Sequence, residues 1–161
     1  MHTLPQLVEE DITVLDGALH DLLAKSDASA AMITDKAGFC LVQHCNIDSF
    51  DLTSIAALAS GSFEATQAIA RFIDEPNFSC VYQQGEKYSL LVSNIDEQTV
   101  LIVIFPCGVS VGLVKYYGGE TIRAAASQFD KARTRAPGQG LDLAMLNMAD
   151  TADIFKKRGD Q

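Results

Sequence analysis

The sequence lacks a hydrophobic run long enough to cross a bilayer, which takes about 20 consecutive apolar residues in a helix. The longest uncharged apolar run, 99–114, is shorter and is interrupted by Pro106 and Gly108. Near the N-terminus, positions 9–11 are acidic, whereas a signal peptide would have positive charge there. We therefore expect a cytoplasmic protein with no membrane contact.

Positive charge is also scarce. The 161 residues include 12 Lys and Arg but 21 Asp and Glu, a formal net charge of −9. Such a surface repels a phosphate backbone, so nucleic acid is excluded as a partner. A basic patch on another protein remains a suitable partner. At 48% hydrophobic residues, the composition is that of a globular domain.

The four cysteines predict neither a disulfide framework, which a cytoplasmic protein does not need, nor a zinc site. The four cysteines, at positions 40, 45, 80 and 107, include no pair with zinc-ligand spacing. We interpret them as small hydrophobic residues in or near a core. The sequence also contains no P-loop, no dinucleotide-binding glycine motif after a strand and no H-E-x-x-H pattern. We expect no metal and no cofactor.

One catalytic pattern is present. Residues 108–112 read G-V-S-V-G, which fits the G-x-S-x-G nucleophile elbow of serine hydrolases. In that fold the base follows the serine, but His2, His20 and His44 all precede Ser110. No parallel crossovers are visible either. We interpret Ser110 as capping or opening the last helix, Gly108 and Gly112 as a tight chain reversal, and the protein as having no catalytic residues.

Hydrophobic periodicity and turn signals predict an α/β domain, an α+β sandwich with a largely antiparallel sheet, over residues 1–135. The segment from 109 shows both alternating and helical spacing, and we expect a helix. A Pro-Gly linker then precedes an apolar tail, so residues 136–161 are expected to be a flexible extension, and a docking peptide is plausible there. The expected elements are a helix near 5–24, strands at 29–34 and 39–45, a helix from about 48 to 73, strands at 78–84, 86–93 and 98–105, and a helix at 109–133.

The long middle helix has an unusual composition. One set of large apolar residues is expected to form its core stripe: Leu52, Ile55, Leu58, Ile69, Phe72 and Ile73. Most of its other positions are Ala, Gly or Ser, which lets another backbone approach closely. Two explanations stay open: the helix packs tightly against its own sheet, or it offers this smooth face to a partner.

Four segments of the sequence carry a family resemblance through their order and spacing. They are the turn Asp35-Lys36-Ala37-Gly38, then 46–73 (NIDSFDLTSIAALASGSFEATQAIARFI), 100–105 (VLIVIF) and 110–114 (SVGLV). With this order and spacing the chain resembles the Roadblock / dynein light chain family, and within it the MglB-type regulators of the bacterial Ras-like GTPase MglA. A tail segment, ADTADIF at 149–155, resembles that group more weakly.

The resemblance implies a Roadblock-like fold: a mostly antiparallel five-stranded sheet with one long helix on one face and two helices on the other. It implies a homodimer whose sheets join through the third strand and whose long helices lie side by side. The dimer would bind an MglA-like GTPase over its switch regions and stimulate hydrolysis without supplying catalytic groups, in a process such as cell polarity or gliding motility. The alternative is a dimeric scaffold that binds proteins without changing turnover.

The resemblance also assigns residues by position. Glu64 departs from the family pattern, because MglB-type helices tend to have a small residue at this position. The residues expected to bind the GTPase are Ala57, Gly61, Glu64, Ala65, Ala68 and Arg71 of the long helix, with Ile154 and Phe155 of the tail. Those expected at the dimer interface are Ala59, Phe63, Cys80, Val81 and Tyr82.

Overall fold

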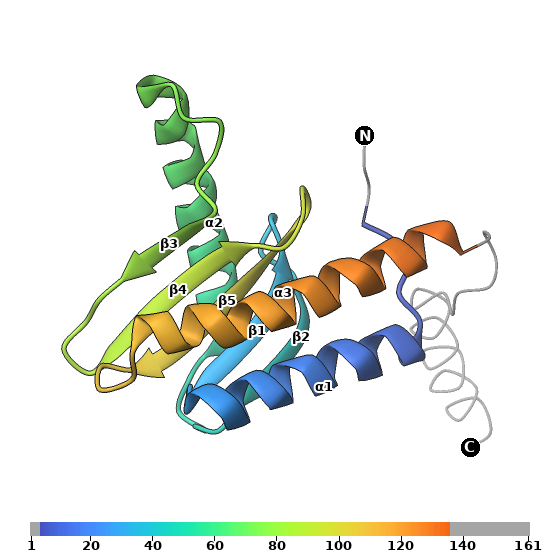
Figure 1. Ribbon diagram of the computed structural model, residues 1–161, viewed down its shortest axis with the longest axis horizontal. Helices are drawn as coiled ribbons and strands as arrows, with labels where there is room; N and C mark the ends of the chain where they lie inside the picture. The colour runs from blue at the N-terminus through green and yellow to red at the C-terminus, as the bar shows by residue number, and fades with distance from the viewer. Residues whose placement is uncertain (1–3, 136–161) are drawn as a thin grey trace, which may run out of the picture.

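The computed structural model describes residues 4–135. The expected tail, with Ile154 and Phe155, lies outside the described residues. All the expected helices and strands are present in the expected order (Figure 1). They are α1 Glu9–Ser26, β1 Ala30–Asp35, β2 Cys40–Cys45, α2 Leu52–Ala70, a short 3-10 helix η1 Arg71–Ile73, β3 Cys80–Gln83, β4 Tyr88–Asn94, β5 Thr99–Pro106 and α3 Val111–Thr134.

The strands form one antiparallel sheet in the order β2-β1-β5-β4-β3. α1 and α3 lie side by side on one face, and α2 crosses the other (Figure 1). This arrangement confirms the expected Roadblock-like sandwich. Within the described chain β2 and β3 are the edge strands, and each pairs on one side only.

The central strand β5 supplies both cores. Leu101, Val103 and Phe105 pack under α1 and α3, whereas alternate residues such as Val100 and Ile102 pack under α2. Side chains on successive strand residues point to opposite faces, so an apolar residue at every position serves a strand covered on both sides. The prediction that this strand is buried on both faces is confirmed.

Local hydrogen bonds explain where α1 begins. The carboxylate of Asp11 accepts a hydrogen bond from the Val8 backbone N–H at 2.8 Å, and the helix starts at Glu9 rather than near Pro5. The acidic residues 9–11 lie in the first turn, where the helix dipole favours negative charge.

The expected core stripe of α2 is wrong at its outer members. Leu58 is 73% exposed and Phe72 is 89% exposed, and Ile69 and Ile73 also lie on the surface. There are two physical reasons. Leu58 lies on the side of α2 turned away from the sheet, whereas the end of α2 and η1 extend beyond the strands (Figure 1). The helix rests on the sheet through smaller residues and one aromatic ring: Ala56, Ala59, Ser60 and Phe63.

Candidate functional site

Some of the small residues of α2 pack against the β1–β2 hairpin of the same chain. Gly38 ends the β1–β2 turn with a positive φ of 96°, and a Cβ built on it would lie 2.8 Å from the Ala57 Cα. Nearby, the hydroxyl groups of Thr34 and Ser60 are hydrogen-bonded at 3.0 Å in the interior. Small residues at 57 and 60 therefore let the hairpin contact the helix closely, which supports the first of the two explanations for this helix.

The remaining side of α2 is open. Of the six helix residues expected to bind a partner, Ala57, Gly61, Glu64, Ala65 and Arg71 are exposed and Ala68 is half-buried. Exposed large apolar residues lie beside them on the same helix. We define the α2 outer face by Leu58, Gly61, Ala65, Ala68, Ile69 and Phe72. It is an apolar surface with small residues at its centre.

Sequence reasoning missed Leu58, Ile69 and Phe72 as surface residues because a core stripe was the simplest use for them. A signal was available. α2 is apolar on more than one side, whereas a single sheet covers only one side of a helix. A second apolar side is then left for another contact, and here it is the one with the largest side chains.

Two of the expected dimer residues lie elsewhere. Phe63 is 1% exposed, and Ala59 is buried beside it in the core between α2 and the sheet. Both side chains face this chain's own strands, because the helix approaches the sheet along that side. We therefore leave Ala59 and Phe63 out of the proposed dimer surface.

The other expected dimer residues lie on the edge strand β3. Cys80 and Val81 are half-buried, and Tyr82 is exposed with its ring stacked on Phe105 at 6.1 Å between centroids. β3 pairs with β4 through Cys80↔Ser93 to Gln83↔Leu90, and its other edge has no strand beside it among the described residues. β3 is short and has no charged side chain that would deter strand pairing.

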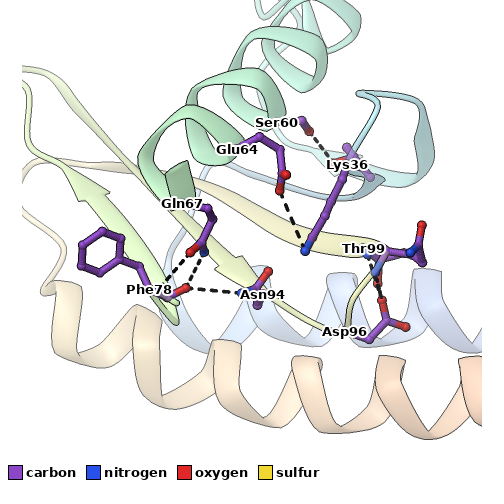
Figure 2. Close-up of polar contacts among 10 residues, drawn as sticks. Lys36, Ser60, Glu64, Gln67, Phe78, Asn94, Asp96 and Thr99 are labelled. Carbon is purple, nitrogen blue, oxygen red and sulfur yellow. Dashed lines mark hydrogen bonds and ion pairs between the residues drawn. The ribbon is translucent and has the colours of Figure 1, made fainter. Parts of the chain in front are cut away.

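A polar cavity of about 460 Å³ lies beside α2. Two hydrogen bonds hold the Gln67 side chain in place at this cavity: its amide nitrogen donates to the Phe78 carbonyl at 2.6 Å, and its amide oxygen accepts from the Phe78 N–H at 2.8 Å (Figure 2). Asn94 donates to the same carbonyl at 3.3 Å. The cavity is lined by Lys36, Glu64, Gln67, Arg71, Pro76, Asn77, Asn94, Asp96 and Glu97.

Glu64, the charge that departs from the MglB-type pattern, faces a cation of its own chain. Its Oε1 lies 3.9 Å from the Nζ of Lys36 in the hairpin turn (Figure 2). Both side chains are partly exposed and the separation is long, so the pair stabilises the fold by at most about 1 kcal/mol. This contact leaves the carboxylate available to a partner.

Asp96, at the other side of the cavity, is fully engaged. Burial alone would raise its pKa, but hydrogen bonds from Arg133, Thr99 and the Gln98 N–H outweigh that effect and lower the pKa. The carboxylate is therefore ionised and committed to the β4–β5 turn and to α3. It contributes negative charge to the cavity but has little free hydrogen-bonding capacity.

The elbow motif has no partner residues in the described chain. Ser110 immediately precedes α3, and its backbone carbonyl accepts from Val114 at 3.2 Å, so it opens the helix as expected. His20 Nδ1 and His44 Nε2 lie 3.3 Å apart and contact each other. Among residues 4–135 the Ser110 side chain makes no hydrogen bond to the helix that it precedes. The turn before it has no positive φ at Gly108, so it does not need a glycine there.

Two further findings concern residues 4–135. No helix there is both long enough and apolar enough to span a bilayer. No group of three or more His, Cys, Asp or Glu side chains there is arranged to hold a metal ion.

Three helices around a five-stranded antiparallel sheet, with an open edge strand and a long helix apolar on its outer side, define a Roadblock-type domain. Residues 15–105 match the model of the Roadblock/LC7 domain, and the chain belongs to that family. No curated protein matches the sequence.

Solved structures of MglB resemble this chain over most of its length. A structure described as MglB with tetrameric arrangement is 25% identical, with a TM-score of 0.76, and covers 82% of this chain and 99% of its own. The gliding protein MglB from Thermus thermophilus is also 25% identical, with a TM-score of 0.74 and coverages of 81% and 99%. Myxococcus xanthus MglB has the same identity and TM-score, with coverages of 81% and 98%.

Proposed function

We propose that this protein is a homodimeric regulator of a small Ras-like GTPase, MglA-like in type. It would act as a GTPase-activating or effector protein that binds the switch regions and supplies no catalytic residue. The observation that carries the proposal is the α2 outer face, which is apolar, smooth at its centre and uncovered by the rest of the described chain. The similarity to MglB supports this choice of partner.

Dimer formation would use β3 and the projecting end of α2. An open edge strand without charge pairs readily with a second copy, and a two-fold axis places β3 beside its own counterpart. Ile69, Phe72 and Ile73 are exposed residues at the end of α2 and in η1, the part of the chain that projects past the sheet (Figure 1). Burying such side chains contributes about 1.5–3 kcal/mol each, which offsets part of the free-energy cost of association.

The GTPase would meet the smaller residues of the same helix. Gly61 and Ala68 leave room for the backbone of a partner to approach, as Ala57 does for the hairpin of this chain at Gly38. The net charge of −9 favours a basic patch on the partner and speeds the encounter at low salt. Leu58, which the dimer contact leaves free, would then exclude water at the rim.

The test uses the purified protein and a purified MglA-like GTPase from the same source. Multi-angle light scattering measures the dimer and its complex with the GTPase loaded with GTP or GDP. Phosphate release measures turnover with and without this protein. We expect a dimer, preferential binding of the GTP form and faster hydrolysis. A protein that stays monomeric at micromolar concentration and binds neither form would contradict the proposal.

The second candidate is a dimeric scaffold, and Glu64 favours it. A carboxylate within an otherwise small surface alters which partner fits. Binding of a GTPase or another protein with an unchanged rate of phosphate release would identify the scaffold. The same assay therefore separates the two functions.

A further inference from the structure

We propose that the polar cavity beside α2 holds a basic side chain, an arginine, from the protein partner. The inference rests on the proposed function only in that the partner binds next to the α2 outer face. Glu64, Gln67 and Arg71 line the cavity from the same helix that presents Ala68. A partner on that face therefore has a direct path into the cavity.

The first argument is a buried acceptor. The Oδ1 atom of Asn94 is buried and has no hydrogen-bond partner among the described residues. Its amide orientation is fixed, because Nδ2 donates to the Phe78 carbonyl and a flipped amide would set two oxygens against each other. Figure 2 shows the Asn94 oxygen on the side turned away from Phe78. A buried carbonyl oxygen in this position is satisfied by a donor, not by another acceptor.

The second argument is the charge of the rim. Glu64 and Glu97 are exposed carboxylates that line the cavity, and Asp96 adds a third negative charge. Of the two cations there, Lys36 lies 3.9 Å from Glu64, well beyond the 2.7–2.9 Å of a charge-assisted hydrogen bond. An incoming guanidinium can displace that lysine and pair with Glu64, and it reaches the Asn94 oxygen once the side chains that bury this atom give way.

The chemistry selects arginine among basic groups. A guanidinium has five N–H donors in a planar fork, so it can serve an amide oxygen and two carboxylates at once. A carboxylate or phosphate would meet Lys36 and Arg71, but it would also face three acidic side chains and leave Asn94 without a donor. Cavities of this volume take small ligands, so one long side chain fits.

The experiment measures binding to the protein alone by NMR. The probe is N-acetyl-arginine amide, and the comparison probe is N-acetyl-citrulline amide, which has nearly the same shape without the charge. We expect a saturable shift of the Asn94 side-chain amide and of the Lys36 and Glu97 backbone amides with the arginine probe. The citrulline probe should bind at least about fivefold more weakly, because it lacks the positive charge that attracts the carboxylates of the cavity.

Variants assign the site. Glu64→Gln and Glu97→Gln should each weaken the arginine probe about two- to fivefold, as expected for partly exposed charge pairs. Lys36→Met should strengthen it, because Glu64 loses its internal partner. The matched control is Glu86→Gln, an exposed glutamate in the β3–β4 loop outside the cavity, which should change nothing. Unchanged thermal unfolding confirms that each variant is folded.

Three outcomes would overturn the inference: no saturable shift with the arginine probe, equal binding of the citrulline probe, or stronger binding of inorganic phosphate or N-acetyl-glutamate amide. Because the probes need no GTPase, this result is independent of the proposed function. If the protein binds its GTPase but not the arginine probe, the proposed function stands and the arginine site is refuted. If it binds the arginine probe but not the GTPase, the arginine site stands and the proposed function is refuted.

Discussion

The carboxylate of Asp11 accepts two hydrogen bonds from the guanidinium of Arg135, at 2.8 and 2.9 Å, and joins the first turn of α1 to the residue that follows α3. Asp11 is fully buried and also accepts from the Val8 N–H and from the Gln128 amide at 2.6 Å. Every lone pair of a buried charge is thus used. The two ends of the described domain are held together by one carboxylate.

Asp11→Asn should destabilise the fold by about 3 kcal/mol, the lower end of the range for breaking a buried ion pair, because Arg135 remains 21% exposed. The Arg135 guanidinium beside Asp11 holds the pKa of that carboxyl well below its ordinary value of 3.8; burial opposes this shift, and the Val8 and Gln128 hydrogen bonds assist it. A lowered folded pKa means that this stability is present above the unfolded pKa and is lost as the pH falls below it.

Urea unfolding between pH 7 and pH 3 measures this contribution. The wild-type protein should lose stability steeply in the acid part of that range, and Asp11→Asn should lose less. Asp21→Asn, on an exposed position of α1, is the matched control and should follow the wild type. Parallel curves for Asp11→Asn and the wild type would show that the pair has no such role.

Gly38→Ala should destabilise the protein by about 1–3 kcal/mol. The new methyl group would meet the Ala57 Cα at 2.8 Å, and the backbone there has a φ of 96° that alanine rarely adopts. Gly17→Ala is the control in the interior of α1, where nothing lies within 4 Å of the added Cβ. It should stabilise by up to about 1 kcal/mol. Chemical denaturation compares the two, and similar effects of the same sign would contradict the close contact between hairpin and helix.

Much of this fold is predictable from the sequence because local chemistry and global packing agree. The apolar run of β5 predicts a strand covered on both sides, and the Asp35–Gly38 tetrapeptide predicts the hairpin turn. In α3, Gly118 does not end the helix: it is buried beside Leu101, and a Cβ there would lie 3.7 Å from a methyl group of that residue, an ordinary contact distance. Periodicity alone still favoured a helix there, and that prediction is confirmed.

The orientation of α2 was not predictable in the same way. Large and small apolar residues lie on different sides of the helix, and the sequence pattern does not show which of these sides packs against the sheet. Packing decides: small residues allow close approach, so Ala56 and Ser60 face the strands while Leu58 and Phe72 face outward. The polar cavity was equally hidden, because its lining comes from separate segments of the chain.

Phe72→Asp should shift the protein from dimer to monomer at micromolar concentration. The ring is 89% exposed in the single chain, so the fold does not depend on it, but a carboxylate in a dimer interface would be buried without a partner. Tyr116→Asp is the matched control, an exposed aromatic on α3 at the opposite face of the sheet. Sedimentation velocity measures both variants, and an undiminished dimer for Phe72→Asp would place the interface elsewhere.

Deleting the residues after Pro137 should leave the dimer folded and lower its affinity for the GTPase. A short apolar segment on a tether gains from high local concentration once the main interface forms. The acidic residues Asp142, Asp150 and Asp153 should make that gain sensitive to salt. Calorimetry at low and high salt compares the full and shortened chains. Identical affinities at both salt concentrations would remove Ile154 and Phe155 from the mechanism.

Ala68→Arg should abolish binding of the GTPase while the dimer persists. Position 68 is half-buried on the α2 outer face, so a long charged side chain there would hold the partner backbone away and leave a charge unpaired in the interface. Ala124→Arg, an exposed alanine on α3 at the other face of the sheet, tests whether added charge alone matters and should keep wild-type affinity. Light scattering confirms that both variants are dimers before calorimetry with the GTP-loaded GTPase. If Ala68→Arg binds as tightly as Ala124→Arg, the GTPase does not use this face of α2.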